Sequence, residues 1–174
     1  MSSFAVTAIA TVAAAALMIA ESLLSKRNEH ALRRAGAIEP ADDRHRMMRV
    51  AYPAAFIAMA AEGAWRAWPP GATTLAAIAC FVAAKALKYW AMASLGPLWS
   101  FRVLVLPGVP LVSAGPYRWL RHPNYVGVIG ELAGFALLVG APIAGVLGTA
   151  SFALLLRQRI RVEEHSLGIA PRPV

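Results

Sequence analysis

Apolar residues follow one another along most of this chain in long runs that short basic segments separate. Three runs extend from Phe4 to Leu24, from about Met47 to Trp65, and from Thr73 to about Ser94. A fourth extends from Val126 to Leu156, and Glu131 is its only ionisable residue. A helix of about 20 apolar residues crosses the hydrocarbon core of a bilayer. The pattern therefore predicts membrane-spanning helices.

The fourth run is too long for one crossing and too short for two complete ones. Its 31 residues would measure roughly 46 Å as one helix, whereas the hydrocarbon core is about 30 Å thick. Gly140-Ala141-Pro142 lies near its middle and favours a break. We therefore predict a helical hairpin that enters the bilayer and returns, which brings the expected number of helices to five.

The composition agrees with a membrane protein. Hydrophobic residues make up 59% of the 174 residues and charged residues 15%, whereas soluble proteins carry about 25% charged residues. The sequence shows no internal repeat, low-complexity tract or second domain, so we predict an all-α polytopic membrane protein with a single domain over residues 1–174. Cys80 is the only cysteine, which excludes an intramolecular disulfide and a cysteine-based zinc site.

The net charge of +8 comes from basic residues that gather between the apolar runs. Residues 25–49 hold the largest group: Lys26, Arg27, Arg33, Arg34, Arg44, Arg46 and Arg49. Such segments stay on the cytoplasmic side of a membrane. We predict a cytoplasmic loop there, an N-terminus outside, and location in a bacterial inner membrane. Because the charges flank the membrane, we expect no nucleic-acid partner, and we expect no metal.

Charged residues also occur inside or at the ends of the apolar runs. Glu62 and Arg66 are four residues apart and are expected to pair on a helix. Lys85 and Lys88 lie near the far end of the third run, and we expect both to extend toward the lipid headgroups. The alternative is a functional one, since ionisable residues within a membrane often mark sites. Glu131 raises the same question within the hairpin.

A first polar segment, residues 115–125, precedes the hairpin. Pro123 suits the first turn of a helix, with His122 near the cap position. The free amide groups there, with Arg118 and Arg121 close by, would receive an anion such as a carboxylate. Three aromatic side chains could face a flat ring or a cation: Tyr117, Trp119 and Tyr125.

A second polar segment, residues 157–165, follows the hairpin and should lie on the same side of the membrane. Arg159 and Glu163 are four residues apart, so they face the same way on a helix. A carboxylate there can accept hydrogen bonds from a ribose diol or an amine. From spacing alone, a helix cap and a solvated face at the headgroups remain the alternatives.

The sequences Gly-Pro-Tyr-Arg-Trp-Leu-Arg-His-Pro-Asn-Tyr and Arg-Ile-Arg-Val-Glu-Glu, with the apolar hairpin between them, resemble the isoprenylcysteine carboxyl methyltransferase family of membrane enzymes. The resemblance covers residues 85–167 or so. It implies S-adenosylmethionine as cofactor and a cytoplasm-facing cofactor pocket that the C-terminal segment closes. It implies these cofactor contacts: Val109, Pro110, Leu111, Val112, Tyr117, His122, Pro123, Asn124, Tyr125 and Glu163.

The resemblance also places Arg159 at the methyl acceptor. His122 and Tyr125 are further candidates for catalysis, because a hydroxyl acceptor would need a group that takes its proton. The sequence departs from eukaryotic members at residue 109, where they usually have a basic residue, and at Arg102, which replaces a Gln. The roles of these departures stay open.

The acceptor is expected to be lipophilic and to reach the site from the bilayer. Small bacterial relatives that methylate alkylpyrone or alkylresorcinol lipids look similar, notably over residues 95–103. We therefore favour an S-adenosylmethionine-dependent O-methyltransferase acting on a lipophilic small molecule, with a prenylated cysteine carboxylate as the second choice. The alternatives are a phospholipid amine N-methyltransferase and a non-enzymatic scaffold or transport protein.

Overall fold

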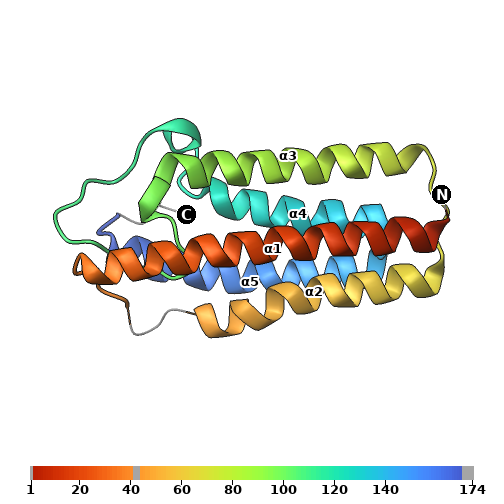
Figure 1. Ribbon diagram of the computed structural model, residues 1–174, viewed down its shortest axis with the longest axis horizontal. Coiled ribbons are helices and arrows are strands. Elements are labelled where there is room, and N and C mark those ends of the chain that lie inside the picture. Colours follow the sequence, from red (N-terminus) through yellow and green to blue (C-terminus); the bar gives the residue numbers. More distant parts are fainter. Residues whose placement is uncertain (1, 41–43, 170–174) are drawn as a thin grey trace.

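The computed structural model describes residues 2–40 and 44–169, and its α-helices run side by side along the long axis (Figure 1). The helices are α1 (Ser3–Arg34), α2 (His45–Arg66), α3 (Ala72–Leu95), α4 (Pro123–Val139) and α5 (Pro142–Ser166). Two short 3-10 helices, η1 (Gly96–Leu98) and η2 (Gly115–Arg118), lie between α3 and α4. Within the described ranges the only β-pairing is an isolated bridge between Ile38 and Val105. The predicted all-α class is confirmed.

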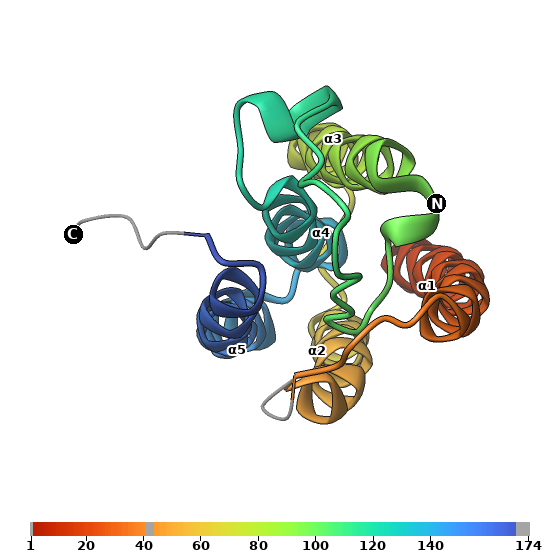
Figure 2. The same ribbon diagram turned by 90° about the vertical axis from the view of Figure 1, so that its left-hand side faces the viewer.

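Three of these helices are long and apolar enough to cross a bilayer: α1, α3 with η1, and α5. The apolar helix α4 has 17 residues, so it measures about 26 Å. Figure 2 shows α4 in the middle of the bundle, with α1, α2, α3 and α5 around it. Its side chains Leu132, Phe135 and Val139 are buried against the neighbouring helices. The chain is thus a polytopic helical membrane protein.

Glycines on α4 allow α3 to approach it closely. A β-carbon at Gly134 would lie 2.8 Å from the backbone nitrogen of Phe81 and 2.9 Å from its Cα. A β-carbon at Gly127 would lie 3.0 Å from the carbonyl oxygen of Ala84. Small residues at helix contacts are typical of membrane bundles, where van der Waals packing holds the helices together.

Gly134→Ala should therefore destabilise the bundle, although alanine favours helix formation. The new methyl group would meet backbone atoms of α3, which cannot move aside as a side chain can. We expect a loss of about 1–3 kcal/mol in the free energy of unfolding, seen as a lower Tm in detergent. Gly148→Ala is the matched control, because its nearest neighbours are side-chain carbons of Ala55 and Met59 at 3.2 and 3.3 Å. Equal Tm values for the two variants would contradict this account of the α3–α4 contact.

The predicted hairpin is present, and its turn is where the sequence placed it. Gly140 ends α4 with a left-handed φ of 70°, a conformation that glycine adopts without strain, and Pro142 begins α5. Glu62 of α2 accepts hydrogen bonds from the amides of Ile143 and Ala144, at 3.2 and 2.6 Å. Glu62 also pairs with Arg66 at 2.7 Å, as predicted. The α2 end and the hairpin turn are thereby joined.

The predicted loop over residues 25–49 is wrong at both ends. The first helix continues to Arg34 and the second begins at His45. The reason is packing: Ser25, Asn28 and Leu32 are buried on one side of α1. The side chain of Asn28 donates to the carbonyl of Trp99 at 2.8 Å, and that of Ser25 accepts from the amide of Phe101 at 2.8 Å. Four of the cations that suggested a loop are exposed on α1: Lys26, Arg27, Arg33 and Arg34.

Candidate active site

A cavity of about 530 Å³ lies among the helices at the end of the bundle where α1 connects to α2. We call this end of the bundle the polar end, and residues 96–122 lie across it (Figure 2). Cavities of this size hold small-molecule ligands and cofactors. Nearly all residues predicted for the site line it: Val109, Pro110, Leu111, Val112, Tyr117, His122, Asn124, Tyr125, Arg159 and Glu163.

Pro123 is the exception among the predicted contacts. It is buried at the first position of α4 and is absent from the cavity wall. Its place there follows from its fixed φ, which suits the start of a helix, and His122 is the cap residue as predicted. Pro123 therefore orients the two residues that follow it, Asn124 and Tyr125, which do line the cavity. The C-terminal segment contributes Leu167 to the wall, and its residues after 169 lie outside the described part.

The Tyr125 hydroxyl joins the two polar segments. It donates to the carboxylate of Glu163 at 2.5 Å and accepts from Nε of Arg159 at 2.8 Å. Arg159 and Glu163 share one side of α5, as the spacing predicted, and Tyr125 reaches them from the first turn of α4. A cation and an anion thus meet on one hydroxyl in the cavity wall. We call these three side chains the Tyr125 relay.

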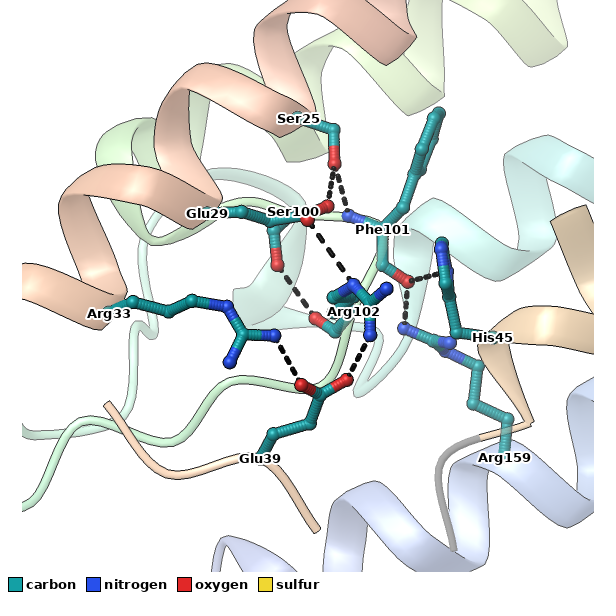
Figure 3. A network of polar contacts seen from close by, with 9 residues as sticks. All are labelled: Ser25, Glu29, Arg33, Glu39, His45, Ser100, Phe101, Arg102 and Arg159. Atoms are coloured by element: carbon teal, nitrogen blue, oxygen red, sulfur yellow. Dashed lines mark hydrogen bonds and ion pairs between the residues drawn. The ribbon is translucent and has the colours of Figure 1, made fainter. Parts of the chain in front are cut away.

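Arg159 is also tied to the segment that covers the cavity. Its guanidinium donates to the carbonyl of Phe101 at 2.5 Å, and Nδ1 of His45 lies 3.2 Å from the same oxygen. Figure 3 shows this carbonyl between the two side chains, with Ser25 holding the Phe101 amide on the other side. The Arg159 side chain is therefore held in one place by α1, α2 and the segment around Phe101, and only 4% of it is exposed.

An ion-pair network at the rim extends from this segment and involves Arg102. Arg102 pairs with Glu29 at 3.3 Å and with Glu39 at 2.5 Å, and Arg33 pairs with the other oxygen of Glu39 (Figure 3). Partial burial alone would raise the pKa of Glu39, but the hydrogen bonds from Arg33 and Arg102 outweigh it and lower that pKa. Glu39 is therefore ionised at neutral pH and fastens the α1–α2 connection to Arg102, which lines the cavity.

Aromatic groups form the side of the cavity next to the first polar segment. The rings of His122 and Tyr125 are stacked, with centroids 5.5 Å apart. Nε2 of His122 lies 3.1 Å from a carboxylate oxygen of Glu164, and this contact fixes the orientation of the ring. Burial, and then the charge of Glu163, raise the pKa of Tyr117 well above its usual value. Tyr117 therefore remains a hydrogen-bond donor at every ordinary pH.

The cavity wall includes exposed residues in two places, at the polar end and on the apolar stretch of α1. Val109 and Leu111 are 42% and 56% exposed at the polar end. Ile19 of α1 also lines the cavity and is 61% exposed, within the apolar stretch of that helix. A ligand with a polar head and an apolar tail could place the head inside while the tail leaves toward lipid.

Sequence reasoning missed a cluster of buried charges beside the cavity. Lys85 and Lys88 of α3 do not extend to the headgroups as predicted: they are 7% and 2% exposed. Both contact Glu21 of α1, at 2.7 and 2.6 Å, and both contact Glu131 of α4, at 3.1 and 3.3 Å. Tyr52 of α2 donates a hydrogen bond to Glu131. A carboxylate near the end of an apolar run, as at Glu21, was the signal that could have revealed the cluster.

These features define a helical membrane protein with a small-molecule cavity at one end of the bundle. Comparison with known families identifies it further: residues 77–169 match the isoprenylcysteine carboxyl methyltransferase (ICMT) family. The chain belongs to this family and is a membrane methyltransferase.

Two bacterial proteins are similar along most of their length. The uncharacterized protein YpbQ of Bacillus subtilis (strain 168) is 34% identical over 148 residues, which cover 85% of this chain and 88% of YpbQ. An uncharacterized protein of Haemophilus influenzae is 26% identical over 145 residues, which cover 83% of this chain and 84% of that protein. No solved structure matches the chain.

Proposed function

We propose that this protein transfers the methyl group of S-adenosylmethionine to an oxygen atom of a lipophilic acceptor. The observation that carries the proposal is the Tyr125 relay. It places an arginine suited to an anionic acceptor and a carboxylate suited to a cofactor on one hydroxyl. Both line a cavity whose wall includes the lipid-side residue Ile19. This combination suits a methyltransferase that acts on amphipathic acceptors.

The residues present suit the cofactor. Glu163 can accept hydrogen bonds from an amine or a ribose diol, and Tyr117 offers a donor that stays protonated. The apolar stretch 109–112 and the stacked rings of His122 and Tyr125 suit a flat purine. When bound, S-adenosylmethionine supplies an electrophilic methyl group on a sulfonium.

The work left to the protein is positioning and exclusion of water. Arg159 is buried and held by Tyr125 and Phe101, so it can fix an anionic oxygen in one orientation. A carboxylate acceptor arrives ionised and needs no base. For a hydroxyl acceptor, His122 is the candidate base, since it lines the cavity and Glu164, 3.1 Å from Nε2, fixes the orientation of its ring.

The basic residues indicate the orientation in the membrane. The cations between residues 26 and 49 lie at the polar end of the bundle, together with the cavity. By the positive-inside rule this end faces the cytoplasm, where S-adenosylmethionine is present. We therefore place the protein in a bacterial inner membrane, with the acceptor approaching from the lipid side past Ile19.

The test is transfer of a radiolabelled methyl group from S-adenosylmethionine by purified protein in lipid vesicles. Four acceptor classes are offered: a long-chain phenol, a long-chain enol, a prenylated cysteine and phosphatidylethanolamine. We expect label in the phenol or enol product, and label in the prenylated cysteine would still be O-methylation. Label in phosphatidylethanolamine alone would contradict an oxygen acceptor. Failure to bind S-adenosylhomocysteine at all would contradict the enzyme.

A further inference from the structure

The proposed reaction assigns no role to the buried charge cluster beside the cavity. We infer that Lys88 and its neighbours form a second polar subsite for the acceptor, in which Lys88 donates a hydrogen bond to a neutral oxygen other than the one methylated. The inference rests on the proposed function and names the class of acceptor: a lipid whose head carries at least two oxygen functions.

The cluster extends the cavity wall toward the middle of the bilayer. Three of its members, Glu21, Tyr52 and Lys88, line the cavity together with the Tyr125 relay. The other two, Lys85 and Glu131, do not. On α4, Glu131 follows Tyr125 by six residues, or about 9 Å along the helix axis. An acceptor head that reaches Arg159 therefore has a second polar wall in the same cavity.

The cluster is electrically balanced. Its two carboxylates and two ammonium groups sum to zero, which is the condition under which charges persist inside a membrane. An additional carboxylate or ammonium group on a ligand would disturb that balance at a depth where uncompensated charge is costly. The subsite therefore suits a neutral carbonyl or hydroxyl oxygen, and disfavours a second ionised group.

Lys88 retains a donor for such an oxygen. An ammonium group has three N–H donors. Among the described residues, Lys88 contacts two carboxylates, Glu21 at 2.6 Å and Glu131 at 3.3 Å, and its ammonium lies 5.5 Å from the centre of the Tyr52 ring. These two hydrogen bonds use two donors, and we assign the third to a group in the cavity that Lys88 lines.

Lys85 provides the internal comparison. It lies one turn before Lys88 on α3 and contacts the same carboxylates, Glu21 at 2.7 Å and Glu131 at 3.1 Å. The two lysines therefore have the same role in holding α1, α3 and α4 together. They differ in access, because Lys88 is part of the cavity wall and Lys85 is not. A purely structural cluster would tolerate the loss of either lysine equally.

The test compares two double variants that keep the cluster neutral: Lys88→Met with Glu131→Gln, and Lys85→Met with Glu131→Gln. Each retains one lysine bonded to Glu21, and the glutamine can still accept from Tyr52. The probes are pentadecylphenol, with one ring hydroxyl, and pentadecylresorcinol, with two. Binding is measured by calorimetry in detergent with S-adenosylhomocysteine present, and cofactor affinity is measured separately for each variant.

We expect the wild type and the Lys85→Met, Glu131→Gln variant to bind pentadecylresorcinol about tenfold more tightly than pentadecylphenol. This is the effect of one hydrogen bond from a charged group. The Lys88→Met, Glu131→Gln variant should lose this preference while binding S-adenosylhomocysteine like the wild type. The subsite would be overturned, with the methyltransferase proposal intact, if the two double variants had equal probe preferences. It would also be overturned if the wild type bound both probes equally, or bound neither. Loss of cofactor binding by the wild type would instead overturn the proposed function and the subsite together.

Discussion

Glu163→Ala should weaken binding of S-adenosylhomocysteine by about 1.5–3 kcal/mol, or roughly 10- to 150-fold in Kd. Glu163 is the carboxylate of the Tyr125 relay and lines the cavity. Its removal takes away a charged acceptor for the cofactor and leaves the Tyr125 hydroxyl without its acceptor. The measurement is calorimetric titration of detergent-purified protein, with wild type and variant side by side.

Two controls separate this effect from misfolding. Arg161→Ala changes an exposed residue of α5 that is absent from the cavity wall, and its Kd should match that of the wild type. Glu163→Gln keeps an oxygen that Tyr125 can donate to but removes the charge, so its Kd should lie between those of wild type and Glu163→Ala. An unchanged affinity in Glu163→Ala would remove the carboxylate from the cofactor site.

The helices of this fold were predictable because lipid imposes a strong constraint. A chain inside a membrane must satisfy its backbone hydrogen bonds within helices, so apolar runs of sufficient length identify them. The hairpin turn followed in the same way, since Gly140 can end one helix with a positive φ and Pro142 can begin the next. What the apolar pattern could not give was the end of α1, where Ser25 and Asn28 continue the helix by bonding to residues 99–101.

The site was predictable in its parts and unpredictable in its connections. Spacing put Arg159 and Glu163 on one side of a helix, but only the packing of α4 against α5 brings the Tyr125 hydroxyl between them. The same holds for the charge cluster. Lys85 seemed suited to the headgroups because its partners, Glu21 and Glu131, are 64 and 46 residues away in sequence. Polar residues in apolar runs find partners across helices, and a sequence pattern does not contain those pairings.

The segment around Phe101 connects the site to the rest of the bundle. Its amide is held by Ser25, and its carbonyl is shared by His45 and Arg159. The Arg159 guanidinium is thus set by backbone geometry as well as by Tyr125, which limits the orientations it can adopt. An arginine fixed in this way can align an acceptor oxygen with the methyl group, and alignment is the larger part of what a methyl transfer requires of its enzyme.

Arg159→Ala should therefore lower kcat by about 100-fold, the usual cost of a misplaced reactant, while the Kd for S-adenosylhomocysteine changes by less than about threefold. The substitution removes the group that aligns the acceptor but leaves the Tyr125–Glu163 hydrogen bond in place. Methyl transfer to the best acceptor is measured beside cofactor titration, with Arg157→Ala, exposed on the same helix, as the control with normal values for both. If Arg159→Ala loses cofactor affinity as strongly as Glu163→Ala, the relay acts as one cofactor-binding unit and the separate acceptor role is wrong. If kcat is unchanged, the acceptor must be aligned by other groups, and Lys88 is then the next residue to test.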